Sequence, residues 1–152
     1  MSDVERAVSC FKSGFCCSQA IFSTYAPRFG VDRDTALKIA TGFCGGMGRL
    51  GKTCGAVTGA FMLIGLKYGR TRIDDDEAKE KTYRLVREFA EKFTSRNGTI
   101  TCNDLLGCDI STPEGHRLAE EKNLFDTLCP RLVQDAAEIV EEMKLSERDL
   151  VS

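Results

Sequence analysis

The apolar residues of this chain recur at helical spacing along almost its whole length. Near the N-terminus, Val4, Ala7, Val8 and Phe11 fall at positions i, i+3, i+4 and i+7, the apolar stripe of an amphipathic helix. Strand-like alternation nowhere extends beyond about four residues. The pattern therefore predicts an all-α fold, a compact single-domain bundle of roughly five to seven helices that spans residues 1–152.

One segment, residues 54–68, is more apolar than the rest and begins with the sequence CGAVTG. Its Gly55 and Gly59 are four residues apart, so they share one face of a helix and would let a second backbone approach closely. Gly69 is the expected C-terminal cap. We therefore predict that this CGAVTG helix is the buried centre of the fold.

A long charged helix is expected from residue 77 to about residue 96. The acidic triplet 74–76 would cap its N-terminus, and Gly98 would end it. Glu88 and Lys92 form one of its i,i+4 pairs of opposite charge, which are typical of a solvent-exposed helix face. This helix is expected to lie at the surface of the bundle.

Charge and composition exclude several classes of function. The net charge is −2 and the sequence pI is near 5.5, which argues against nucleic-acid binding through a basic face. His116 is the single histidine, so a multi-histidine metal site is excluded, and its polar neighbours predict a solvated side chain. No signal-peptide pattern or membrane-length apolar run is present, which predicts no membrane insertion and a cytoplasmic location.

A glycine-rich loop is expected between residues 44 and 53. Its GMGRLG sequence, residues 46–51, matches the dinucleotide fingerprint G-x-G-x-x-G. That fingerprint needs a preceding strand, whereas the residues before this one have helical spacing. The segment is therefore interpreted as a loop that brings Cys44 and Cys54 close to other residues.

Cysteine is the residue type that most indicates chemistry here, with eight in the chain. Cys54, Cys102 and Cys129 stand where helices are expected to begin. Free backbone N–H groups and the helix dipole stabilise a thiolate at such positions and lower its pKa. Cysteine is also a good small core residue, but three at helix starts in one short chain favour a site. No Cys-x-x-Cys pair is present, so distant segments would have to assemble it.

Several segments together resemble one known family. CGAVTG at residues 54–59 resembles the signature of the C_GCAxxG_C_C family, whose members are assigned a redox or electron-transfer role mostly by inference. The resemblance continues through GFCCSQA at residues 14–20, TCNDLLGCD at 101–109 and LCPRLVQDAAEIVEEM at 128–143. One departure is Cys16, where the family often has a polar residue such as asparagine.

The resemblance implies a site and a cofactor class. A related domain occurs in split-Soret cytochromes, where the cysteines are associated with an iron–sulfur centre. The implied site residues are Cys17, Cys54, Cys102 and Cys129, with Cys44 close by. Either Cys17 or Cys44 is the family's first cysteine, so either could complete the group.

Three functions compete at this stage. The first is a redox-active cysteine protein that acts in thiol/disulfide or electron transfer with a redox partner protein, either as an oxidoreductase or as an electron-transfer protein. The second is binding of an iron–sulfur cluster or zinc by the four cysteines, since thiolates suit both. The third is a non-catalytic helical interaction module, with the small-residue helix face serving a homodimer.

Overall fold

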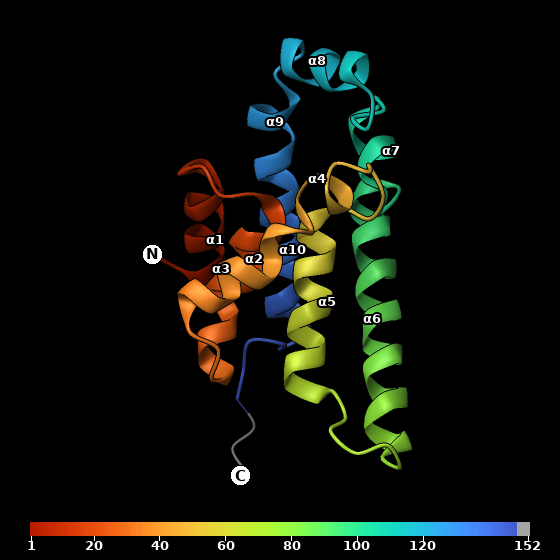
Figure 1. The fold of residues 1–152 in the computed structure, drawn as a ribbon. Helices are drawn as coiled ribbons and strands as arrows, with labels where there is room; N and C mark the ends of the chain where they lie inside the picture. The colour runs from red at the N-terminus through yellow and green to blue at the C-terminus, as the bar shows by residue number, and fades with distance from the viewer. Residues whose placement is uncertain (149–152) are drawn as a thin grey trace.

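The computed structural model describes residues 1–148, which form ten α-helices and one short 3-10 helix (Figure 1). Seven helices have nine or more residues: α1 (Asp3–Lys12), α2 (Cys17–Tyr25), α3 (Arg33–Thr41), α5 (Gly55–Tyr68), α6 (Asp76–Asn97), α8 (Pro113–Glu121) and α10 (Cys129–Glu142). The shorter elements are η1 (Ala26–Phe29), α4 (Cys44–Met47), α7 (Cys102–Leu106) and α9 (Leu124–Thr127). The predicted all-α fold is confirmed.

The CGAVTG helix, α5, is the buried centre of the fold as predicted. It packs between α2 and α6, and α10 also contacts it (Figure 1). Most residues in its first two turns are buried, because close packing covers this end of the helix on several sides. Its two glycines face α2: a Cβ at Gly55 would lie 2.9 Å from the Ser18 backbone nitrogen, and one at Gly59 would lie 3.0 Å from the Ser18 carbonyl oxygen.

Substitution of Gly59 by leucine is expected to lower the free energy of unfolding by about 1–3 kcal/mol, because the side chain would force α5 away from α2. Gly65 on the same helix is the matched control, since a Cβ there meets no atom within 4 Å. Gly65→Ala should leave stability unchanged or raise it by up to about 1 kcal/mol. Urea unfolding followed by circular dichroism measures both. A Gly59→Leu variant as stable as the parent would refute the close packing.

Helix α6 has the predicted caps but different ion pairs. The Asp75 side chain accepts a hydrogen bond from the Ala78 N–H, and Gly98 ends the helix with φ +86°. The pairing expected between Glu88 and Lys92 is replaced by a contact between helices: Lys92 Nζ lies 2.9 Å from Glu142 Oε1 of α10. The helix period alone cannot reveal this partner, because it depends on where α10 packs.

The glycine-rich segment forms α4 and a tight loop. Gly46 has φ +65°, so the segment is not a regular helix. An isolated antiparallel bridge between Thr53 and Thr101 ties the end of this loop to the start of α7. The short helices α4, α7 and α9 thereby gather at the end of the bundle where α5 and α10 begin (Figure 1).

The surroundings of His116 differ from those predicted. His116 is half-buried rather than solvated: its Nδ1 lies 3.1 Å from Glu120 Oε1, and its ring centroid is 5.4 Å from that of Phe125. Aromatic packing from α9 covers it, which the polar neighbours in sequence do not indicate.

Within residues 1–148, no helix combines the length and the apolar character needed to cross a membrane.

Candidate functional site

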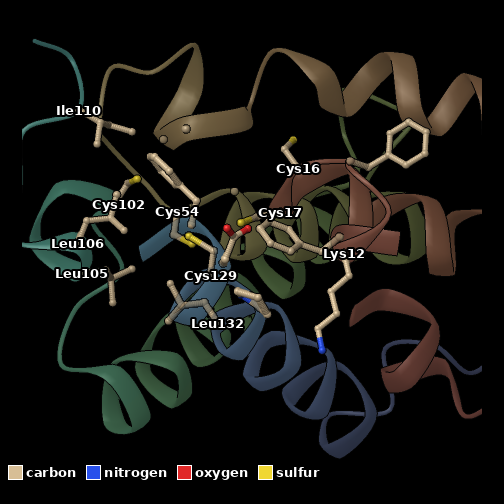
Figure 2. A pocket seen from close by; sticks show the side chains of 18 of the residues that line it. Lys12, Cys16, Cys17, Cys54, Cys102, Leu105, Leu106, Ile110, Cys129 and Leu132 are labelled. Atoms are coloured by element: carbon tan, nitrogen blue, oxygen red, sulfur yellow. The ribbon is translucent and has the colours of Figure 1, made fainter. Parts of the chain in front are cut away.

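A cavity of about 540 Å³ lies where the short helices meet the starts of α2, α5 and α10. Cys17, Cys54, Cys102 and Cys129 all line it (Figure 2). Its other walls are mostly apolar, and the charged side chains among its lining residues are Lys12 and Asp126. The structure thus brings together four cysteines of which each is 27 to 48 residues from the next in the sequence.

Each of the four cysteines stands at the start of a helix. Cys17, Cys102 and Cys129 are the first residues of α2, α7 and α10, and Cys54 is the N-cap of α5. The sequence indicated three of these positions, although it placed Cys54 one residue further into its helix. The start of α2 at Cys17 was not predicted as a thiolate position.

Backbone pairing sets Cys54 and Cys102 on adjacent segments. The Cys54 N–H donates to the Ile100 carbonyl at 2.8 Å, and the Cys102 N–H donates to the Lys52 carbonyl at 2.5 Å. Gly46 closes over this pair: a Cβ there would lie 2.8 Å from Cys102 Cβ and 2.6 Å from the Lys52 backbone nitrogen. Only glycine fits at this position, which explains why the glycine-rich segment adjoins the cavity.

Local interactions distinguish Cys54 from its neighbour Cys17. The neighbouring Cys17 thiol stabilises the thiolate form of Cys54, and this, with the nearby N–H groups of Ala56 and Val57, lowers the pKa of Cys54 against the opposing effect of burial. Hydrogen bonding to Cys129 and then to Cys54, together with burial, raises the pKa of Cys17 well above its ordinary value. Cys54 is therefore the sulfur that favours the thiolate, and Cys17 keeps its proton.

Cys102, which was also predicted as a thiolate position, behaves differently from Cys54. Burial raises the pKa of Cys102 to about 12, and repulsion by negative charge on Cys54 and Cys129 adds to the effect. The expectation that the start of its helix would lower this pKa is wrong. Helix α7 has only five residues, so its dipole is small and desolvation dominates.

Cys16 and Cys44 form a disulfide, with their Cα atoms 5.7 Å apart. The sequence left open whether Cys17 or Cys44 would join the other three cysteines, and the structure places Cys17 with them. This disulfide was not predicted from the sequence. Cys16 is the residue that departs from the family pattern, and that departure was the available signal.

One of the comparisons with known proteins identifies a family. Residues 15–143 match a family model described as "Putative redox-active protein (C_GCAxxG_C_C)". The chain belongs to the C_GCAxxG_C_C family. A search of curated proteins found no match, and a search of solved structures found none either. The family resemblance found in the sequence is confirmed, and the coarse assignment as a redox-active protein follows from it.

The donor set of this C_GCAxxG_C_C protein also suits a soft metal or cluster. Four thiols around one cavity are the ligand type that iron–sulfur clusters and structural zinc take, and no second kind of donor is needed. Among the described residues, no three or more cysteine, histidine or acidic side chains already surround one point that an ion could occupy. Cys17, Cys54, Cys102 and Cys129 are the residues that would hold such a group.

Proposed function

We propose that this protein carries out thiol–disulfide exchange in the four-cysteine cavity, with Cys54 as the nucleophile and Cys17 as the resolving thiol. The observation that carries the proposal is the closeness of these two cysteines: both line the cavity, and a Cβ at Gly55, the residue after Cys54, would lie 3.2 Å from Cys17 Cβ. The pKa of Cys54 is lowered and that of Cys17 is raised. A thiolate with an adjacent protonated thiol is the arrangement that thiol–disulfide exchange needs.

The reaction runs in two balanced steps. The Cys54 thiolate attacks one sulfur of a partner disulfide, so that a mixed disulfide forms and the first partner thiolate leaves. This thiolate takes the Cys17 proton. The Cys17 thiolate then attacks Cys54 Sγ, forming the Cys17–Cys54 disulfide and releasing the second partner thiolate, which takes a proton from water. Two electrons pass from the protein to the partner, and the reverse sequence oxidises a dithiol.

The other two cysteines have supporting roles in this proposal. Cys129 also interacts with the Cys17 thiol, which holds Cys17 between two sulfurs. Cys102 stays protonated at neutral pH because its pKa is about 12, so it does not compete with Cys54 as a nucleophile. The apolar walls shield the sulfurs from water, and Cys54 is only 3% exposed.

Anaerobic oxidation tests the proposal. Purified protein is incubated with an excess of a linear small disulfide, bis(2-hydroxyethyl) disulfide, and free thiols are counted before and after. We expect the loss of two thiols per chain, with no visible absorbance before or after the reaction. Cys10→Ser is the matched control, because Cys10 is half-buried but lies outside the cavity. An unchanged thiol count under excess oxidant would contradict the exchange function.

A four-thiolate iron–sulfur or zinc site is the second candidate. The observation in its favour is that all four cysteines, including the protonated Cys102, line one cavity. The bound group would supply electron transfer in the case of a cluster, or structural cross-linking in the case of zinc. Visible absorbance at about 400 nm in the anaerobic preparation, or stoichiometric zinc, would favour this candidate over thiol–disulfide exchange.

A further inference from the structure

A second hollow of about 350 Å³ lies beside the four-cysteine cavity. Its lining includes both residues of the Cys16–Cys44 disulfide together with Arg49, His116 and Glu120. Both cysteines are half-buried, so the disulfide borders a space that a small molecule can enter. Cys16 also lines the inner cavity, and the disulfide therefore borders both spaces.

The two cysteines of this disulfide lie in backbone segments of different kinds. Cys16 is the N-cap of α2, and its N–H donates to Gln19 Oε1 at 3.1 Å. Cys44 instead belongs to the segment 42–51, in which five of the ten residues are glycine. Glycine backbones lose the most conformational freedom when they are ordered, so this segment depends strongly on its anchors.

Other contacts between α2 and α3 stop short of this segment. The Ser18 hydroxyl donates to the Ala40 carbonyl at 2.8 Å, and the Gln19 amide donates to Leu37 and Thr41. These hydrogen bonds reach residue 41, and beyond it Ser18 and Gln19 make only long contacts of 3.7 Å and 4.0 Å with the Cys44 sulfur. From residue 42 onward, the covalent tie to α2 is the disulfide.

The same segment covers one of the four cysteines. Gly46, two residues after Cys44, lies against Cys102, so closely that a Cβ at Gly46 would come within 2.8 Å of Cys102 Cβ. The Lys52 N–H donates to the Gly46 carbonyl at 3.0 Å, and this bond helps to keep the loop folded over the cavity. The order of the segment therefore controls access to Cys102.

We propose that Cys16–Cys44 is a second redox site, reduced by a small thiol that enters the outer hollow, and that its reduction opens the cover over the inner cavity. A thiolate of the reductant attacks one sulfur of the disulfide, giving a mixed disulfide and one cysteine thiolate. A second thiolate attacks the reductant sulfur, releasing the oxidised reductant and the second cysteine thiolate. Both thiolates take up protons, so one disulfide and two thiols become two cysteines and one small disulfide.

The experiment measures the alkylation rate of Cys102 by iodoacetamide, read by mass spectrometry of the Cys102 peptide. Wild-type protein with the Cys16–Cys44 bond intact is compared with protein treated with dithiothreitol and then freed of it. We expect Cys102 to be alkylated at least about tenfold faster after reduction, because local opening exposes it. Mapping of the Cys16 and Cys44 peptides verifies the state of the bond.

Variants separate the disulfide from other effects of reduction. Cys16→Ser should give the fast Cys102 rate without any reductant, and Cys44→Ser repeats the test from the other end. Cys10→Ser is the control, and its Cys102 rate should still depend on the disulfide. Equal Cys102 rates with the bond intact and reduced would overturn the proposal. The readout needs no exchange at Cys54, so it is independent of the function proposed above.

Discussion

Replacement of Cys54 by serine is expected to slow reduction of an added disulfide by at least about a hundredfold. A hydroxyl at the start of α5 is not ionised near neutral pH, so the attacking thiolate is lost while the shape of the side chain is almost kept. Anaerobic incubation with a chromogenic aromatic disulfide measures the rate, because each exchange releases a coloured thiolate. Stability should change little, since Cys54 is the N-cap of α5 and serine is a favourable residue at that position.

Two matched variants make this result specific. Cys17→Ser should still give the first attack by Cys54 but stop at the mixed disulfide, which mass spectrometry detects as an added partner mass. Cys10→Ser should react at the parental rate, because Cys10 lies outside the cavity. A Cys54→Ser variant that retains the parental rate would remove Cys54 from the nucleophile role.

The pH dependence of alkylation should differ sharply between two cysteines of the same cavity. The pKa of Cys54 lies below the ordinary thiol value, so its rate should rise with pH and level off early. The pKa of Cys102 is about 12, so only about one molecule in ten thousand carries its thiolate at pH 8. At that pH we expect Cys54 to react at least about tenfold faster, even though a thiolate of low pKa is intrinsically less nucleophilic.

The shape of each profile checks this expectation without depending on how exposed the two sulfurs are. Iodoacetamide labelling followed by peptide mass spectrometry gives one curve for each cysteine. The Cys102 curve should still be rising at pH 10, where the Cys54 curve has reached its plateau. Coincident curves would show that the surroundings of Cys54 at the start of α5 do not lower its pKa below that of Cys102.

Much of this architecture could be predicted from the sequence because it depends on local signals. The apolar period places the helices, and Gly98 and Asp75 mark the ends of α6. The CGAVTG segment indicates the buried helix, since only small residues allow the close approach of α2. Positions at helix starts likewise predicted that Cys54, Cys102 and Cys129 would face a shared site.

What the sequence could not predict depends on tertiary packing. The partner of Lys92 is Glu142, because α10 lies against α6, and no spacing within α6 reveals this. The pKa of Cys102 follows burial rather than helix position. The Cys16–Cys44 disulfide requires the folded arrangement of α2 and α4, because its two cysteines are separated by 28 positions in the chain.

Peptide mapping of the oxidised protein tests the central claim most directly. The protein is oxidised anaerobically with an excess of bis(2-hydroxyethyl) disulfide, its remaining thiols are blocked at low pH, and its cross-linked peptides are identified by mass spectrometry. A new link between Cys17 and Cys54, absent before oxidation, is the expected result. Cys17 and Cys54 both recovered as blocked free thiols, after an oxidation that removes thiols elsewhere, would contradict the claim that this pair is the redox centre.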